Sequence, residues 1–383
     1  MKTIIKNGTV FTPQEVIQNG WVVIEDGCIV SFGGEIEIGS DPSARVIDAE
    51  GNRVIPGLID THIHGAGGFD MTGGDCAKAA EHLPSQGITS FLATTHFLIP
   101  HDELVQAVSE IASIIGKPQN GANILGIHME GPWIAAERSS MGTQGLCYPL
   151  TRDDIGLFQQ TAKGTIRMIT FAPEQGNSID VIPFLKELNI IPSIGHSNAD
   201  YEFAMRVIGM GINHSTHTLN GMVPMHQRKP GLVAALLNSP SVLCELISDG
   251  FNVQPPVMQI LIKIKGIDNV CLISDALPIN GMPDGSHIFW DGFDIYTNGI
   301  ISTLKDGSPA GAYKLLNYGL KVIAEETNIP LKDAIYMAST VPARMLGIMK
   351  GQIKAGYDAD IVILGDDYDP VKTMIGGRIV YER

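Results

Sequence analysis

Hydrophobic positions give most of the chain one repeating pattern. From residue 54 onward, short apolar runs alternate with longer stretches of helical periodicity, such as Glu103–Ile115 and Tyr201–Ile208. This alternation is typical of βα units built around parallel strands. Eight such runs occur, at Val54–Ile59, Ile88–Ala93, Asn123–Met129, Thr165–Phe171, Ile190–Gly195, Gly211–Thr216, Val242–Ile247 and Asn269–Ser274. The pattern therefore predicts an α/β protein with a closed (β/α)8 TIM-type barrel.

The two ends of the chain have a different pattern, with short strands separated by turns. Asn7-Gly8, Asn19-Gly20 and Asp26-Gly27 are typical hairpin turns, and short strands return after residue 350. We therefore expect residues 1–55 and 350–383 to form one small β-sandwich domain, and residues 56–349 to form the barrel domain. After the eighth run, the pattern predicts a β-rich insertion and two helical segments, at Ile288–Thr303, Ala310–Thr327 and Leu331–Leu346.

An open, doubly wound parallel sheet is the alternative architecture. That fold would have to place eight strands, and the first run is not followed by the G-x-G-x-x-G turn that such sheets use for dinucleotides. The closed barrel is the better interpretation.

Composition and charge narrow the classes of function. Hydrophobic residues make up 44% of the 383 positions and charged residues only 17%, a mixture that predicts a packed globular protein. The net charge is −15 and no basic run interrupts it, so we expect no binding to nucleic acid or to an anionic membrane. An anionic ligand would have to be held by a local pocket.

The sequence predicts a cytoplasmic location. The first eight residues reach an Asn-Gly turn before an apolar stretch develops, which is not the pattern of a signal peptide. No uninterrupted apolar run approaches the roughly 20 residues of a membrane-spanning helix. The five cysteines are scattered without a C-x-x-C pair, so we expect reduced thiols at Cys28, Cys76, Cys147, Cys244 and Cys271.

Two histidines stand at the end of the first apolar run. His62 and His64 are two positions apart, so the period of a strand points both rings to the same side. Two imidazoles on one side can bind one divalent ion. By itself an H-x-H pair is a weak signal, and it gains weight only from where the other candidate ligands fall.

Further candidate ligands end other strands. The ends of the third, fifth, sixth and eighth runs carry Glu130, His196, His217 and Asp275. In a barrel, the carboxyl ends of all strands open onto one face, where catalytic groups are found. We therefore expect these four residues to converge with His62 and His64.

Imidazole and carboxylate ligands suit zinc, iron, manganese or cobalt, and two such ions need a bridging carboxylate. Six ligands predict two ions per chain, with Glu130 as the bridge. The remaining histidines are expected to be structural: His82, His96, His101, His128, His214, His226 and His287.

With these residues in place, the chain resembles the amidohydrolase superfamily and, within it, the branch of deacetylases that act on N-acetyl amino-sugar 6-phosphates. The resemblance covers essentially the whole chain. It rests on VIPGLIDTHIHG at 54–65, HMEGPW at 128–133, GHSNA at 195–199, THTLNGM at 216–222, RKPG at 228–231, SDA at 274–276 and GQIKAGYDADIVI at 351–363.

The resemblance implies a substrate, a phosphate site and an assembly. The implied substrate is N-acetylglucosamine 6-phosphate, which would be hydrolysed to glucosamine 6-phosphate and acetate by a homodimeric enzyme. The family's phosphate contacts correspond to Arg228, Asn220 and Gly221. A guanidinium fork matches a phosphate, and a turn of free amides adds neutral donors.

Three positions depart from the family pattern. Gln144 and Asn252 stand where the family usually has histidines that contact substrate, and Lys229 replaces an acidic residue after the arginine. Amide side chains can still hydrogen-bond to hydroxyls or to an acetyl carbonyl, but they carry no positive charge. These departures leave open the epimer of the amino sugar, so the galacto epimer is an alternative substrate.

Amide hydrolysis by such a site would use a metal to acidify water and to stabilise the oxyanion. Asp275 is then the group expected to accept the proton of the attacking water and return it to the leaving nitrogen. Two other hypotheses remain: a deaminase of the same superfamily, and a non-catalytic barrel kept as a sensor or scaffold. Loss of ligands would favour the scaffold, and this chain retains all six.

Overall fold

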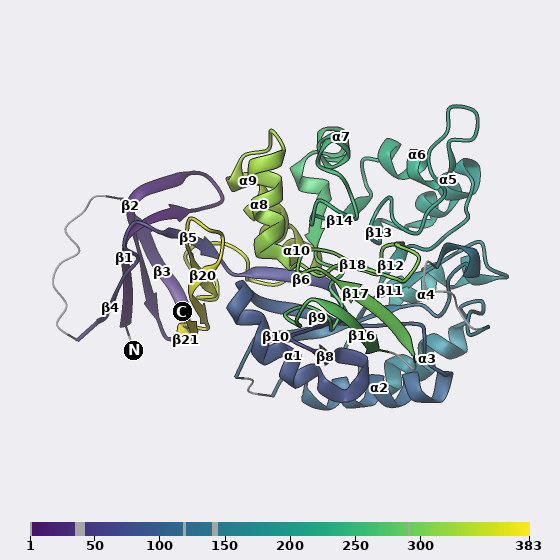
Figure 1. Cartoon of the computed structure of the whole chain (residues 1–383), viewed down its shortest axis with the longest axis horizontal. Coiled ribbons are helices and arrows are strands. Elements are labelled where there is room, and N and C mark those ends of the chain that lie inside the picture. Colours follow the sequence, from purple (N-terminus) through teal and green to yellow (C-terminus); the bar gives the residue numbers. More distant parts are fainter. Residues whose placement is uncertain (1, 35–42, 118–119, 140–144, 290–291) are drawn as a thin grey trace.

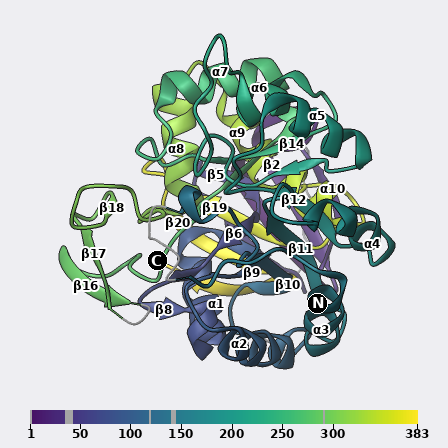
Figure 2. The ribbon, with the colours of Figure 1, turned by 90° about the vertical axis from the view of Figure 1, so that its right-hand side faces the viewer.

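Eight parallel strands form the centre of the molecule. The computed structural model describes residues 2–34, 43–117, 120–139, 145–289 and 292–383. Within them, one parallel sheet has the order β6-β9-β10-β11-β12-β13-β14-β15, with helices around it (Figure 2). Its strands are β6 (Leu58–Ile63), β9 (Ile88–Thr95), β10 (Asn123–Glu130), β11 (Ile166–Phe171), β12 (Ile191–Ile194), β13 (His214–Ser215), β14 (Leu243–Ile247) and β15 (Val270–Ile273).

The first and last of these strands meet through the residues that follow them. The Asp275 N–H donates to the His62 carbonyl at 2.9 Å, and the His64 N–H donates to the Ala276 carbonyl at 2.9 Å. Ile63 and Ala276 form a parallel bridge at the same place. The sheet is thus a nearly closed (β/α)8 barrel, which confirms the predicted fold class, and its closure brings the end of β6 beside the end of β15.

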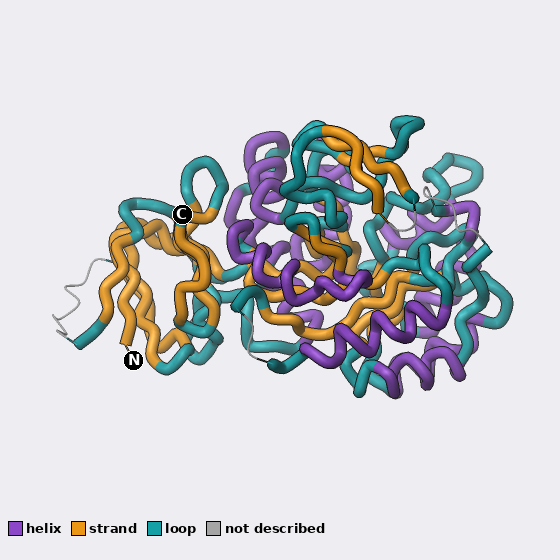
Figure 3. Tube along the Cα trace, turned by 60° about the horizontal axis from the view of Figure 1, so that its bottom comes forward, coloured by secondary structure: helices purple, strands orange, loops and turns teal. Residues whose placement is uncertain are grey.

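Helices cover the outside of this barrel (Figure 3). Every residue of β6 and of β9 is buried, because a parallel strand under helices is covered on both faces. The helices are α1 (Cys76–His82), α2 (His101–Ile114), α3 (Arg152–Thr161), α4 (Ile182–Glu187), α5 (Tyr201–Met210), α6 (Gly231–Asn238), α7 (Pro255–Lys265), α8 (Leu316–Glu326), α9 (Leu331–Ala338) and α10 (Thr340–Leu346).

A second sheet combines the two ends of the chain, whose purple and yellow strands lie together at the left of Figure 1. Its order is β21-β20-β19-β5-β1-β2-β3, with β4 paired to β1. Strand β5 pairs antiparallel with β19, so the ends join there, and this sheet has its own apolar core. The strands are β1 (Lys2–Phe11), β2 (Val16–Glu25), β3 (Cys28–Gly33), β4 (Arg45–Asp48), β5 (Arg53–Pro56), β19 (Ile361–Leu364), β20 (Pro370–Ile375) and β21 (Arg378–Glu382).

The prediction of one barrel strand at Val54–Ile59 was wrong, because this segment contains the end of a strand in one sheet and the start of a strand in the other. Arg53–Pro56 belongs to the end sheet, and the barrel strand begins at Leu58. Gly57 separates them, and a Cβ atom there would lie 2.1 Å from Thr89 Oγ1. A continuous apolar run cannot reveal this boundary, because both strands are buried.

The β-rich insertion after the barrel is a small antiparallel sheet of β16 (Gly285–Phe289), β17 (Phe293–Thr297) and β18 (Ser302–Thr303). All five cysteines are free thiols. Among the helices that the structure describes, none combines the length and the apolar character needed to span a bilayer.

Gly195→Ala should destabilise the barrel. A Cβ atom at this position would lie 2.7 Å from Thr216 Cβ and 2.8 Å from Thr170 Cγ2, inside a packed interior. Such overpacking costs about 1–3 kcal/mol of unfolding free energy, which urea denaturation measures. Gly209→Ala is the matched control, because that helical glycine has open space around it and the change should stabilise by about 0.5–1 kcal/mol. Equal midpoints for the Gly195→Ala variant and the unmodified protein would contradict the expectation.

Candidate metal centre

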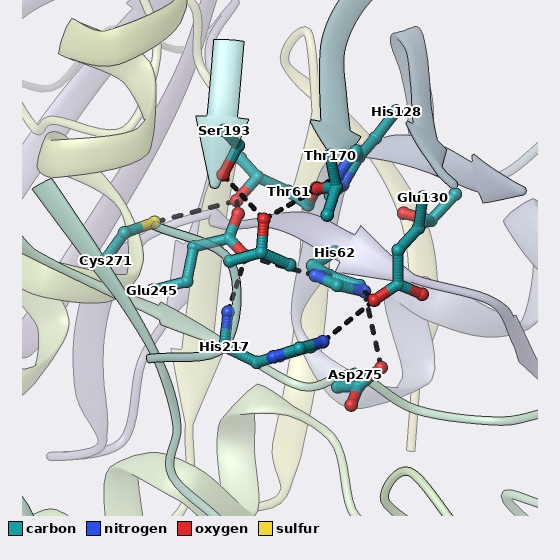
Figure 4. Close-up of polar contacts among 12 residues, drawn as sticks. Thr61, His62, His128, Glu130, Thr170, Ser193, His217, Glu245, Cys271 and Asp275 are labelled. Atoms are coloured by element: carbon teal, nitrogen blue, oxygen red, sulfur yellow. Dashed lines mark hydrogen bonds and ion pairs between the residues drawn. The ribbon is translucent and has the colours of Figure 1, made fainter. Parts of the chain in front are cut away.

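The six predicted ligands meet at the carboxyl mouth of the barrel. His62 lies in β6 and Glu130 ends β10, whereas the other four residues follow strands β6, β12, β13 and β15. His62 is fully buried and Asp275 is only 9% exposed, whereas His196 is partly buried. Figure 4 shows the side chains of His62, Glu130, His217 and Asp275 pointing toward one another.

Glu130 lies between two groups of side chains. Its Oε1 atom is 2.8 Å from His217 Nε2 and 3.0 Å from His196 Nε2. Its Oε2 atom is 3.2 Å from His64 Nε2. Each carboxylate oxygen therefore faces different imidazoles, which is the arrangement that a bridging ligand requires.

Asp275 lies close to the two histidines of the H-x-H pair, His62 and His64. Its Oδ1 atom is 3.3 Å from His64 Nε2 and 3.4 Å from His62 Nε2. His62, His64 and Asp275 form one cluster with metal-ligand spacing, and His62, Glu130 and His217 form another. The two clusters share His62, and Glu130 belongs to the second of them.

Three of these residues have left-handed backbone conformations just after a strand. The φ angles are 45° at His196, 26° at His217 and 53° at Asp275. This region is unfavourable for residues other than glycine and occurs often at functional sites. The turn ends each strand abruptly and aims the side chain across the mouth of the barrel.

The ring orientations of His196 and His217 are set by backbone acceptors. His196 Nδ1 donates to the Arg138 carbonyl at 3.0 Å, and His217 Nδ1 donates to the Asn220 carbonyl at 3.1 Å. Both Nε2 atoms consequently face inward, and they lie only 3.0 Å apart. Two imidazole lone pairs at that distance repel each other unless a proton or a cation lies beside them, so this donor set fits a cation.

The ionisable side chains around Glu130 shift one another's pKa values. Burial raises the pKa of Glu130, but the charge of His62 and hydrogen bonds from His196 and His217 outweigh burial and hold that pKa well below its usual range. Burial lowers the pKa of His64, yet hydrogen bonds to Asp275 and Glu130 raise it to about 9. The Glu130 carboxylate is therefore ionised at neutral pH and attracts positive charge.

A pocket with a volume of about 230 Å³ opens above the cluster. Five of the six candidate ligands line it, together with side chains of other loops. The residues lining it are His64, His96, Phe97, Leu98, Glu130, Arg138, Ser139, His196, His217, Asn220, Gly221, Asn252, Asp275, Leu277, Pro309 and Gly311.

The predicted substrate contacts occupy different positions relative to this pocket. Asn220, Gly221 and Asn252 line it, whereas Arg228 is exposed and does not. Asn220 Oδ1 is buried without a hydrogen-bond partner, so it can accept from a ligand. The Asn252 side-chain nitrogen donates to Asp249 at 2.7 Å and to the Gly311 carbonyl at 2.9 Å. Gln144 lies outside the described residues.

Sequence reasoning missed three residues of this site. Arg138 lines the pocket, and nothing in its local sequence marks it. His96, expected to be structural, also lines the pocket. Glu245 is fully buried and contacts His62, and the only signal in the sequence is one acidic residue within the apolar run Val242–Ile247.

Comparison with known proteins gives a consistent result. The sequence pattern of the Amidohydrolase family matches residues 53–380. The N-acetylglucosamine-6-phosphate deacetylase of Bacillus subtilis (strain 168) is 34% identical, with 99% of this chain and 97% of that protein covered. The N-acetylgalactosamine-6-phosphate deacetylase of Escherichia coli O157:H7 is 29% identical, with 94% of this chain and 96% of that protein covered.

A solved structure is similar over the same length. It is that of an aspartate-to-alanine variant of N-acetyl-D-glucosamine-6-phosphate deacetylase from Mycobacterium smegmatis, in complex with N-acetyl-D-glucosamine-6-phosphate. The TM-score is 0.91 at 28% sequence identity, and 99% of each chain is covered. The similarity therefore includes both the barrel and the sheet built from the chain ends.

Proposed function

The chain belongs to the amidohydrolase family, and we propose that it hydrolyses the N-acetyl group of N-acetylglucosamine 6-phosphate to give glucosamine 6-phosphate and acetate. The observation that carries this proposal is the match to deacetylases of that name along essentially the whole chain. The convergence of four histidines and two carboxylates below a pocket supports the proposal, because amide hydrolysis in this metal-dependent family needs such a donor set.

We assign the ligand roles as part of this proposal. His62, His64 and Asp275 would hold one divalent cation, His196 and His217 would hold another, and Glu130 would contribute to both. A divalent cation bound there polarises an amide carbonyl and makes water more acidic. Zinc or iron suits these nitrogen and oxygen donors, and manganese and cobalt are alternatives.

Asp275 is the proposed acid–base group. Burial raises the pKa of Asp275, but the charge of His62 and a hydrogen bond from His64 lower it below its usual range, so the carboxylate is ionised and able to accept a proton. In the proposed reaction, Asp275 takes a proton from the attacking water and returns it to the amide nitrogen. The water oxygen adds to the acetyl carbonyl carbon, and the C–N bond breaks once its nitrogen is protonated, so that acetate and the amino sugar leave.

Two metal equivalents per chain are expected after reconstitution, because His196 and His217 contact Oε1 of Glu130 whereas His64 contacts Oε2. Elemental analysis alongside activity measures this number. Full activity with one equivalent would contradict the two-metal assignment and would give one ligand group a different role.

Two arginines are proposed to recognise the phosphate. Arg138 lines the pocket, and Arg228 lies on an exposed turn that follows the Asn220-Gly221 segment. Within the described part of the chain, neither guanidinium forms an ion pair, so both are available for an anion. A planar fork that matches phosphate is the reason to prefer arginine to lysine here.

Arg138→Ala and Arg228→Ala should each raise KM for the phosphorylated sugar by about tenfold or more, because a hydrogen bond to a charged group contributes about 1.5–3 kcal/mol. Arg228→Lys should recover only part of this loss, since lysine keeps the charge without the fork. Steady-state kinetics with the unphosphorylated N-acetyl sugar is the control, and KM for that substrate should change little. An unaltered preference for phosphorylated sugar in both alanine variants would overturn the phosphate assignment and favour the deaminase hypothesis.

The galacto epimer is the alternative substrate. The relative from Escherichia coli O157:H7 is named for it, and Asn252 of this chain is a departure from the family pattern. The ratio of kcat/KM for the two epimers decides between them. A homodimer and a cytoplasmic location remain predictions from the sequence, to be tested by light scattering and by cell fractionation.

A further inference from the structure

Glu245 is a buried carboxylate beneath the candidate metal centre. It lies in the middle of β14, is fully buried, and projects toward β6 (Figure 4). Its Oε2 atom is 3.1 Å from His62 Nδ1 and also accepts a hydrogen bond from the His217 backbone N–H at 3.2 Å. One carboxylate oxygen therefore contacts two of the six candidate ligands on the side away from the pocket.

This contact determines the tautomer of His62. An ionised carboxylate only accepts hydrogen bonds, so the Nδ1 atom of His62 must carry the hydrogen. When the ring is neutral, as a metal ligand must be, its Nε2 atom presents the lone pair toward Glu130 and Asp275, where no hydrogen bond engages it. His196 and His217 have the same orientation, but their Nδ1 atoms donate to neutral backbone carbonyls.

His128 fixes the His62 ring from a second direction. The two rings meet edge to face, with centroids 4.7 Å apart. His128 Nδ1 donates to the Thr61 carbonyl at 3.0 Å, and Thr170 Oγ1 donates to His128 Nε2 at 2.8 Å. Both nitrogens of His128 are thus engaged, so the cluster of His62, His128 and Glu245 does not form a metal site of its own.

We propose that Glu245 is a positioning residue that holds His62 as the Nδ1–H tautomer and aims its Nε2 atom at the metal centre. The inference rests on the proposed metal-dependent function. Such carboxylate–histidine pairs orient the ring and make it a more basic ligand, and their loss typically weakens metal affinity about 10–100-fold. Glu245 would contribute this effect without touching the metal or the substrate.

Zinc affinity tests the proposal without relying on turnover. Metal-free protein is titrated with zinc against a competing chelator, and Glu245→Gln should weaken the affinity by about 10–100-fold. Asp360→Asn is the matched control: it removes another buried carboxylate, just before β19, that accepts from the Gly376 N–H and pairs with Lys350. This variant should bind zinc as the unmodified protein does. If Glu245→Gln does not fold, Glu245→Asp replaces it and should give a smaller loss in the same direction.

A double-mutant cycle separates positioning from a general structural effect. In a His62→Ala background, Glu245→Gln should change zinc affinity by no more than about twofold, because its partner is gone. An undiminished loss in that background would overturn the proposal and would assign the effect to the His217 backbone. Unchanged affinity in the Glu245→Gln single variant would also overturn it. Absence of zinc binding by the unmodified protein would instead contradict the proposed function, on which the inference rests.

Discussion

Asp275→Asn should lower kcat by about 10²–10⁴-fold at saturating metal, the range that general acid–base groups contribute. The amide keeps the shape of the side chain. Its oxygen can still face the Nε2 atoms of His62 and His64, which lie 3.4 Å and 3.3 Å from Asp275 Oδ1. It cannot accept the proton of the attacking water. Steady-state kinetics after metal reconstitution measures the effect.

Metal content and unfolding midpoint are the controls for this variant, and both should match those of the unmodified protein. Activity within about tenfold of the unmodified enzyme, which is about 1.4 kcal/mol of barrier, would show that another group carries the proton. In that case Asp275 would be a ligand only.

Glu130→Gln should remove at least one metal and reduce turnover to background. Glu130 lies within 3.2 Å of three candidate ligand nitrogens, and each of its two oxygens contacts at least one of them. A glutamine offers one acceptor oxygen, and its NH₂ group would face either His64 or the His196–His217 pair. Elemental analysis and kinetics in the presence of excess zinc measure the two effects.

Glu174→Gln is the matched control for that variant. Glu174 is a partly buried carboxylate that contacts Ser197 Oγ and the Asn198 N–H, and its hydrogen bonds do not reach the rings of the candidate ligands. We expect it to retain the full metal content. A Glu130→Gln enzyme with two metals and normal kcat would show that the bridging role belongs to another group.

The barrel and the positions of the six candidate ligands could be predicted, because both follow from the order of apolar and polar residues along the chain. A parallel strand buried on both faces must be an apolar run, and β9 shows this along its whole length. Residues such as Glu130 and His217 stand where those runs stop, and a barrel gathers all such ends on one face. The division at Gly57 escaped prediction, since two buried strands of different sheets give one continuous apolar run.

The sequence by itself thus determined the fold class, the meeting of the chain ends and the six residues that converge. Only the tertiary structure decided which nitrogen of His62 faces inward, that Arg138 rather than Arg228 lines the pocket, and that Glu245 lies under the site. The physical reason is distance along the chain. His62 and Glu245 are 183 positions apart, and a hydrogen bond between β6 and β14 leaves no periodic trace in either strand. The role of a buried carboxylate such as Glu245 can be inferred only when its hydrogen-bond partner is known.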